Sequence, residues 1–213
     1  HYAGALRNIK REALAAYEFS RVFDECPTRR IQAYYSFRIR SESVWNEALN
    51  ICKNGREKAT LYFLRGIQPD ALAVEEIRTI QDLDPGSDQA DLLLLREINK
   101  LEADLLGYPF QRESASITTA KPDLREARLQ HLENLKTLVH ETTTSKKMHD
   151  PGLWQLSEVY LTFLGGEQET AYAQLRDLRV GLKNEAAFRA SMLDLVFRIG
   201  MTKHVNASVE NKL

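Results

Sequence analysis

The chain has 213 residues, of which 43 % are hydrophobic and 28 % charged, and its formal net charge is −1. This composition is ordinary for a folded globular protein, and no apolar run approaches the roughly 20 residues that a membrane span needs. The near-zero charge gives no whole-chain affinity for nucleic acid or anionic lipid, so neither nucleic-acid binding nor membrane insertion is expected.

Apolar residues recur at helical spacing along nearly the whole chain, and no segment shows the alternation of a β-strand. Asp150 before Pro151 predicts a helix start, whereas Gly165-Gly166 and Asn54-Gly55 predict helix stops followed by tight turns. We expect helices over residues 2–9, 11–25, 29–39, 42–53, 56–67, 70–83, 87–106, 122–142, 151–164, 167–182 and 184–202.

The stretch 60–87 has the pattern of a helical hairpin. Its two short amphipathic segments are separated by Gln68-Pro69 and closed by Asp84-Pro85-Gly86. A small residue, Ala73, stands where the second helix would press on the first, and Ile77, Ile80 and Leu83 follow it on one face. Such a hairpin cannot bury its apolar face alone, so we expect it to stack on neighbouring helices.

This spacing resembles that of tetratricopeptide repeats, which are helix–turn–helix units of 34 residues. The resemblance is carried by a closing proline preceded by small and apolar residues of a second helix. These are Pro85 after Ala73, Ile77, Ile80 and Leu83, and Pro27 after Ala15, Phe19 and Val22. More weakly, Trp154 falls early in a hairpin that includes Ala171, Leu175 and Leu178. The resemblance implies an all-α, right-handed α-solenoid of stacked antiparallel helical hairpins, with a second helical block after a long loop.

The predicted organisation has four parts. The tetratricopeptide-like repeats occupy residues 1–106, a polar loop or linker 107–121, a second helical block 122–203 and a tail 204–213. Because the chain opens with His1 and helical spacing begins at once, we expect a fragment of a larger protein. A likeness to large bacterial envelope proteins rests on no motif, so the compartment, cytoplasm or bacterial envelope, stays open.

Residue patterns that carry catalysis or metal binding do not stand out. The chain has neither a phosphate-binding glycine loop nor a Gly-x-Ser-x-Gly motif. Glu126, Glu133 and His140 share one helical face but stand two turns apart, too far to hold one ion together. The two cysteines, Cys26 and Cys52, lack zinc-ligand spacing and are expected to be structural thiols. No cofactor, metal or enzymatic activity is therefore expected.

The abundant carboxylates suit exposed ion pairs along helices. They are interleaved with Arg78, Arg96 and Lys100, and they comprise Glu75, Glu76, Asp82, Asp84, Glu97, Glu102 and Asp104.

A basic and aromatic segment is the candidate binding feature. In a tetratricopeptide-like array the first helix of each hairpin lines a concave groove, where arginine would pair with carboxylates and tyrosine would give rigid contact area. Such a groove suits an extended peptide with acidic or carboxyl-terminal groups. The candidate groove residues are Tyr35, Arg38, Tyr62, Arg65, Arg96, Asn99 and Lys100. The alternative is that Tyr34 and Phe37 belong to the core and the arginines to a solvated face.

The hypothesis is a non-catalytic protein–protein interaction module, a scaffold or adaptor, that binds a peptide or protein partner in this groove. A purely structural spacer is the first alternative, and an enzyme with a carboxylate site between helices is the second. The identity of the partner and the oligomeric state stay open.

Overall fold

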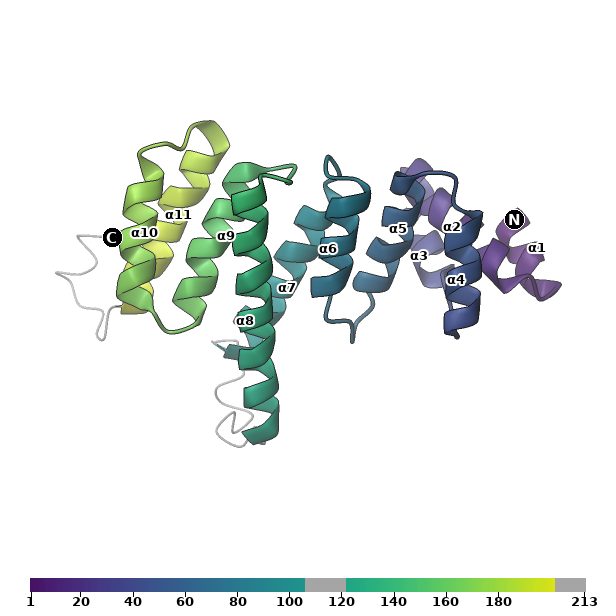
Figure 1. Ribbon diagram of the computed structural model, residues 1–213, viewed down its shortest axis with the longest axis horizontal. Helices are drawn as coiled ribbons and strands as arrows, with labels where there is room; N and C mark the ends of the chain where they lie inside the picture. Colours follow the sequence, from purple (N-terminus) through teal and green to yellow (C-terminus); the bar gives the residue numbers. More distant parts are fainter. Residues whose placement is uncertain (106–121, 202–213) are drawn as a thin grey trace. The chain divides into compact units, whose positions relative to one another are not determined.

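The computed structural model describes residues 1–105 and 122–201 (Figure 1). Within these stretches the regular structure is helical and no strand occurs, which confirms the predicted all-α class. The predicted loop 107–121 and tail 204–213 lie outside the described residues. The α-helices are α1 Tyr2–Asn8, α2 Glu12–Glu25, α3 Arg30–Ser36, α4 Glu42–Ile51, α5 Gly55–Gly66, α6 Val74–Leu83, α7 Gln89–Leu105, α8 Pro122–Ser145, α9 Pro151–Leu164, α10 Gln168–Arg179 and α11 Asn184–Met201; a short 3-10 turn, η1 Pro27–Arg29, precedes α3.

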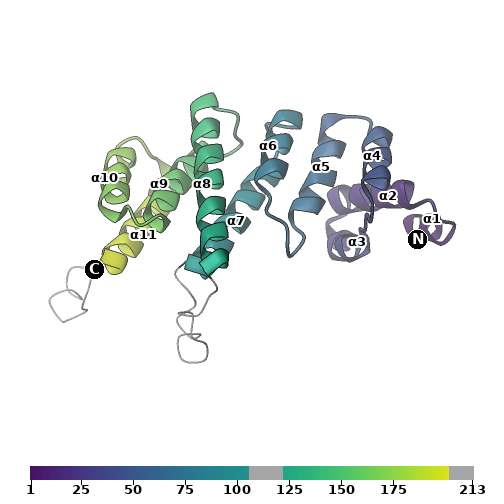
Figure 2. The same cartoon turned by 60° about the horizontal axis from the view of Figure 1, so that its bottom comes forward.

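The chain divides into two compact units, His1–Leu94 and Leu95–Leu213, and the division falls inside α7. In the first unit α2 is the central element and packs against α1, α3, α4 and α5 (Figure 2). Its buried face is lined by small residues, including Ala13 and Ala16, which let neighbouring helices approach closely.

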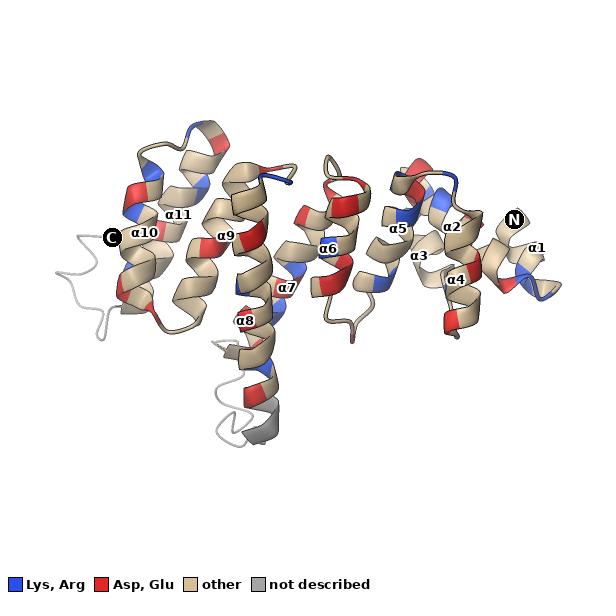
Figure 3. Cartoon of the chain, in the orientation of Figure 1, with Lys and Arg blue, Asp and Glu red and all other residues tan. Residues whose placement is uncertain are grey.

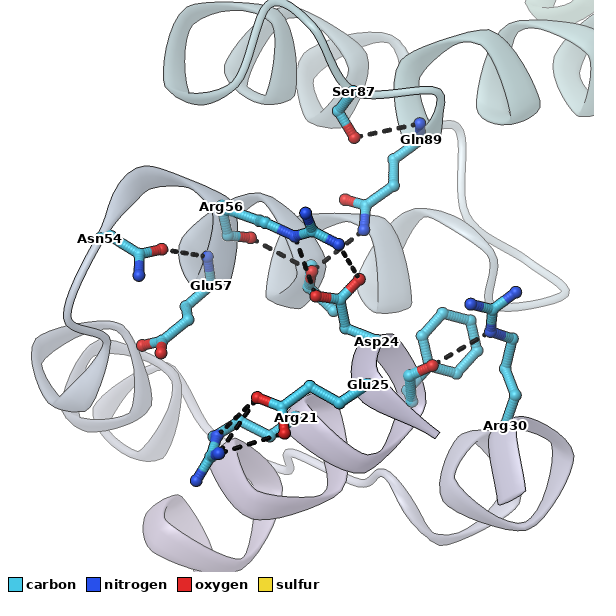
Figure 4. A network of polar contacts seen from close by, with 11 residues as sticks. Arg21, Asp24, Glu25, Arg30, Asn54, Arg56, Glu57, Ser87 and Gln89 are labelled. Carbon is cyan, nitrogen blue, oxygen red and sulfur yellow. Dashed lines mark hydrogen bonds and ion pairs between the residues drawn. The ribbon is translucent and has the colours of Figure 1, made fainter. Parts of the chain in front are cut away.

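A polar network holds α2, α5 and the start of α7 together within the first unit. Arg56 of α5 donates to both carboxylate oxygens of Asp24 on α2, at 3.0 and 3.1 Å (Figure 4). The Gln89 side chain of α7 donates to the Thr60 hydroxyl of α5 at 3.0 Å, and both residues are buried. Hydrogen bonds between side chains of different helices fix the orientation of these helices more specifically than apolar contact alone.

The predicted hairpin is present as α5 and α6, which pack against each other. α6 begins at Val74 rather than at residue 70, because the chain first makes a turn in which the Ala71 N–H donates to the Gln68 carbonyl at 3.1 Å. Ala73 is fully buried, and a Cβ added to Gly66 would lie only 3.2 Å from the Ala73 methyl group. The expected close contact between a small residue and the first helix is therefore confirmed.

Three N-caps follow from the sequence. The side chains of Ser41, Asn54 and Asp150 accept hydrogen bonds from Val44, Glu57 and Leu153 backbone N–H groups, at 3.3, 2.9 and 3.0 Å. The Asp150 start is thus confirmed. The prediction that Asn54-Gly55 ends a helix is wrong, since Asn54 has an extended backbone (φ −151°) and starts α5 instead of stopping α4. The side-chain oxygen of asparagine can accept a hydrogen bond at a helix N-cap, and its backbone can also adopt the left-handed conformation that ends a helix. The residue type alone therefore does not distinguish a helix start from a helix end.

The second unit is built around α9, which packs against α8, α10 and α11 (Figure 1). The rings of Phe163 and Phe197 stack 4.3 Å apart between α9 and α11, and Trp154 is fully buried. α9 ends at the predicted glycine pair, where Gly166 has a left-handed backbone (φ +90°) that closes the turn into α10.

Glycines stand where elements of one unit meet. A Cβ at Gly66 would come within 2.9 Å of the Leu93 side chain, one at Gly152 within 2.7 Å of Ala186 Cβ, and one at Gly200 within 2.7 Å of the Phe163 ring. At each of these positions the neighbouring side chain therefore packs directly against the glycine backbone, in the space that a Cβ atom would need.

Candidate functional site

The segment between α3 and α4 forms the candidate site. α3 ends at Ser36, earlier than the expected residue 39, because the chain turns extended at Phe37 (φ −69°, ψ 119°). This change buries the Phe37 side chain and leaves Arg38 and Arg40 exposed. Residues 37–40 form neither helix nor turn, and the backbone is again extended at Ser41, the N-cap of α4.

Two pockets of the first unit share Tyr35, Arg38 and Arg40. The larger, of about 740 Å³, has a mainly aromatic and apolar wall that includes Trp45 and Pro69. The smaller, of about 350 Å³, lies against α2. The side chains common to both pockets therefore form a ridge between two hollows, which we call the arginine ridge: Tyr35, Arg38 and Arg40.

The arginines of the ridge lack the partners that hold several other arginines of this unit. In residues 1–105 and 122–201, no hydrogen bond, ion pair or ring contact engages the Arg38 or Arg40 side chain. By contrast, Arg30 donates to the Phe23 carbonyl at 3.0 Å, and Arg7 donates to the Ser36 carbonyl. Tyr35 is 70 % exposed, which is unusual for a large aromatic side chain.

Arg65 and Tyr62 support the wall of the larger pocket. The Arg65 guanidinium lies 4.3 Å from the centre of the Trp45 ring and 5.0 Å from that of Tyr62, and it donates to Glu76 at 2.8 Å. Trp45 and Tyr62 meet edge to face at 5.2 Å. Arg65 lines the pocket while its charge is already matched by Glu76, so its contribution is chiefly to shape.

The other three candidates, Arg96, Asn99 and Lys100, lie on the part of α7 that belongs to the second unit. Arg96 and Lys100 each donate to Oε1 of Glu97, at 2.9 and 2.8 Å, whereas Asn99 is exposed. The structure thus brings Tyr35, Arg38 and Arg65 to one pocket and Tyr62 beside Arg65. One groove through all seven residues stays a prediction.

Glu97 was expected to take part in an exposed ion pair. This expectation is wrong, because the Glu97 side chain is fully buried. His131 of α8, also buried, places Nε2 2.9 Å from the second carboxylate oxygen. Burial alone would raise the pKa of Glu97, but the hydrogen bonds from His131 and Lys100 outweigh it and leave this pKa below its ordinary value. Sequence spacing missed this cluster because His131 is 34 positions away, on another helix.

A third hollow, of about 490 Å³ and lined by His140, Glu158 and Asp177, bears on the enzymatic alternative. His140 Nδ1 lies 2.7 Å from Glu158, and the imidazole is 73 % exposed. The hollow is therefore an open surface depression and not the closed carboxylate pocket that an active site between helices calls for.

Other features of the described residues bear on cofactors and membranes. Residues 1–105 and 122–201 hold no group of three or more His, Cys, Asp or Glu side chains placed to bind a metal ion. Cys26 and Cys52 are free thiols. In the same stretches no helix combines the length and the apolar character required to cross a membrane.

Basic and acidic residues are interspersed over the helices of both units (Figure 3). The arginine ridge is thus a local basic feature on a chain whose formal net charge is −1.

Comparison with known proteins gives no family assignment. No family model matches the chain, and no significant similarity to curated proteins or to solved structures was found. The tetratricopeptide-like character accordingly stays a prediction from the residue pattern.

Proposed function

We propose that this chain is a protein–protein interaction module that binds an acidic segment of a partner at the arginine ridge. The observation that carries the proposal is that Arg38 and Arg40 are exposed, border two pockets and have no partner for their charge among the described residues. A guanidinium presents a planar fork of donors that matches a carboxylate, and such charge-assisted pairs are stronger than neutral hydrogen bonds.

The surroundings of the ridge favour a macromolecular ligand. Tyr35 offers a large contact surface with few rotatable bonds, which reduces the entropy lost on binding. Trp45 is held in place by Arg65 and Tyr62, so the wall of the larger pocket is formed before any ligand arrives. Preformed walls lower the free-energy cost of association.

We further propose that the helices form a tetratricopeptide-like, right-handed solenoid of stacked antiparallel hairpins. Its support is that consecutive helices pack against each other and that α9 also contacts α11, the next helix but one. Apart from the α2–α5 pair, the main contacts among the described residues join helices at most two places apart in the chain, which is typical of helical repeat arrays. Arrays of this kind present long surfaces to protein partners.

The first alternative is a spacer that only orients other domains. It requires no ligand, and it leaves the exposed Tyr35 without a role, together with Arg38 and Arg40, which have no partner among the described residues. Because exposed arginines are also common on solvated faces, a binding experiment has to separate these functions.

A crosslinking pull-down with the full chain as bait tests the proposal. The variant Arg38→Glu/Arg40→Glu reverses the charge of the ridge. The matched control is Lys10→Glu/Arg29→Glu, which makes the same charge change at exposed side chains of the same unit that line neither pocket and have no partner among the described residues.

We expect a protein captured by the native chain and by the control variant but lost with the ridge variant, at least about tenfold by quantitative mass spectrometry. Circular dichroism should show equal helicity for all three baits, because the substituted side chains are exposed. Equal capture by the ridge variant would overturn the proposal, and no specific capture by any bait would favour the spacer.

A further inference from the structure

We infer, on the basis of the proposed function, that the smaller pocket beside the arginine ridge binds a phosphorylated side chain of the partner. Three arginines line this pocket: Arg7 of α1, and Arg38 and Arg40 of the ridge. In the described part of the chain Glu12 is the one acid on the pocket wall, so positive charges exceed negative ones by two. A phosphate monoester carries close to two negative charges at pH 7 and therefore matches this excess.

The Arg7 guanidinium is held at the pocket before a ligand arrives. It donates to the Ser36 carbonyl at the end of α3, and it lies 4.9 Å from the centre of the Phe19 ring. Neither contact neutralises its charge, and no acid of residues 1–105 and 122–201 pairs with it. A guanidinium has five N–H groups, so Arg7 keeps donors for an anion beside the two unpaired arginines of the ridge.

The number of arginines favours a phosphate over a single carboxylate. One carboxylate would leave one of the two excess positive charges unmatched, and its two oxygens fit the planar fork of one guanidinium. A phosphate has three acceptor oxygens around a tetrahedral centre and can accept from several guanidinium groups at once. The rest of the pocket wall consists of Ala15, Ala16 and Tyr35, which offer apolar surface to the side chain that bears the phosphate.

The surroundings of the pocket favour a phosphorylated protein over nucleic acid or an anionic membrane. Both of these bind along extended basic surfaces. Acidic residues are instead interspersed with basic ones over the helices of the first unit, and Glu42 stands at the larger pocket (Figure 3). The aromatic wall of the larger pocket borders the same ridge, so a peptide that carries the phosphate finds a second, apolar contact there.

Glu12 provides a test that loss of folding cannot imitate. Its carboxylate is exposed, has no partner among the described residues and stands on the pocket wall. Because it repels a bound phosphate, Glu12→Gln should tighten the binding of a phosphopeptide. Glu47→Gln is the matched control, since it removes the same charge from an exposed side chain of the same unit that lines neither pocket.

Fluorescence anisotropy with labelled nonapeptides tests the inference on the full chain. The probes carry a central phosphotyrosine or phosphoserine, with a leucine on each side, in a Gly-Ser background. The comparison peptides replace the phosphorylated residue by tyrosine, by glutamate or by sulfotyrosine. Sulfotyrosine keeps the ring and the tetrahedral head group but carries a single negative charge.

We expect at least one phosphopeptide to bind at least about tenfold more tightly than each comparison peptide. Glu12→Gln should tighten this binding by about threefold or more, whereas Glu47→Gln should leave it unchanged. Arg7→Gln should weaken it by at least about fivefold, and Arg29→Gln, the same change outside both pockets, should not. A sulfotyrosine or glutamate peptide that binds as tightly as the better phosphopeptide would overturn the inference, as would an unaltered affinity in Glu12→Gln.

Unlabelled competitors distinguish the sources of the phosphate. Phenyl phosphate, a single-stranded oligonucleotide and phosphatidylserine vesicles should each displace the probe only at concentrations at least about tenfold above that of the unlabelled phosphopeptide. Equal potency of any of these would assign the pocket to that class of ligand and overturn the inference of a phosphorylated protein.

The two proposals fail in different ways. In the pull-down, treatment of the extract with a phosphatase should abolish the ridge-dependent capture. Ridge-dependent capture that survives this treatment, together with indifferent peptides, would retain the interaction function and reject the phosphorylated ligand. Capture that does not depend on the ridge, together with indifferent peptides, would reject both.

Discussion

The arginines named above fall into two groups according to the partners of their side chains. Arg65 and Arg96 lie against Glu76 and Glu97 and stabilise the fold, whereas Arg38 and Arg40 have no partner among the described residues. Charge reversal at Arg65 would therefore disturb the Trp45 wall as well as any ligand. Arg38 and Arg40 are the informative positions for tests of binding because their replacement leaves the core intact.

The two cysteines should differ in reactivity. Cys52 is half-buried and its thiol faces the Ala48 carbonyl at 3.4 Å; burial, followed by the charge of Glu57, raises the pKa of this thiol to about 11. Only the thiolate reacts, and at pH 8 about one Cys52 thiol in a thousand is ionised. In a Cys26→Ser variant we expect the rate of alkylation by iodoacetamide to rise about tenfold per pH unit from pH 8 to 10.

The Cys52→Ser variant, which keeps the exposed Cys26, is the control for the reagent. A rate for Cys52 that levels off near pH 9 would show that its thiol is not shielded as the structure indicates.

At the scale of single elements, the cap of α9 is the clearest contribution to stability. Asp150 accepts from the Leu153 N–H at 3.0 Å and from Arg189 of α11 at 2.8 Å. Partial burial would raise the pKa of Asp150, but these hydrogen bonds outweigh it and lower the pKa below its ordinary value. Asp150→Ala should reduce the free energy of unfolding by about 1–2 kcal/mol, measured by urea denaturation.

Asp150→Asn is the matched control, because it keeps the cap and removes the charge beside Arg189. A lowered folded-state pKa contributes stability that is complete above the unfolded-state pKa, about 3.9 for Asp, and is lost as the pH falls through the folded-state value. The advantage of the native chain over Asp150→Asn should therefore be present at pH 7 and shrink below about pH 4. An advantage that grows in acid would contradict this assignment.

The helices themselves were largely predictable from the sequence. Their apolar spacing, the Asp150-Pro151 start and the Gly165-Gly166 stop are local features, and local features determine where a helix begins and ends. The early end of α3 was not predictable, because it depends on Phe37 being buried by other helices. The same holds for Glu97, whose burial results from packing against α8 and not from its own helix.

The candidate site was predictable in part. Tyr35, Arg38 and Arg65 stand out as aromatic and basic residues at helical spacing, and they do line one pocket. The place of Trp45 and the smaller pocket depend on which helices meet, and residue spacing within one helix carries no such information. That Arg38 and Arg40 have no counter-ion in the described part of the chain is likewise seen only when the neighbouring side chains are placed.

At the scale of the whole molecule, each compact unit contains one buried tryptophan, Trp45 in the first and Trp154 in the second. Glu97→Ala would leave the buried His131 without its carboxylate, and loss of one partner of a buried pair typically costs about 3 kcal/mol. In urea denaturation followed by tryptophan emission, we expect a larger drop in midpoint in a Trp45→Phe background than in a Trp154→Phe background.

The double variant Glu97→Leu/His131→Leu is the control, since replacing both members of a buried pair by apolar residues is often nearly neutral. Equal shifts in the two tryptophan backgrounds would show that the chain unfolds as one cooperative unit and that the two compact units are not separate in stability.

The close approaches at Gly66, Gly152 and Gly200 have a consequence for tracing the ancestry of this chain. At each position a Cβ would meet a side chain of its own unit at 2.9 Å or less: the end of Leu93 at Gly66, Ala186 Cβ at Gly152 and the Phe163 ring at Gly200. Because Leu93 can shift more easily than Ala186 or the Phe163 ring, a lineage that keeps this packing has least room for change at Gly152 and Gly200. We therefore expect remote homologues to keep small residues at these three positions, together with residues like Leu93, Ala186 and Phe163 at the positions that contact them. Such a pattern can identify a homologue even when the overall sequence identity is low.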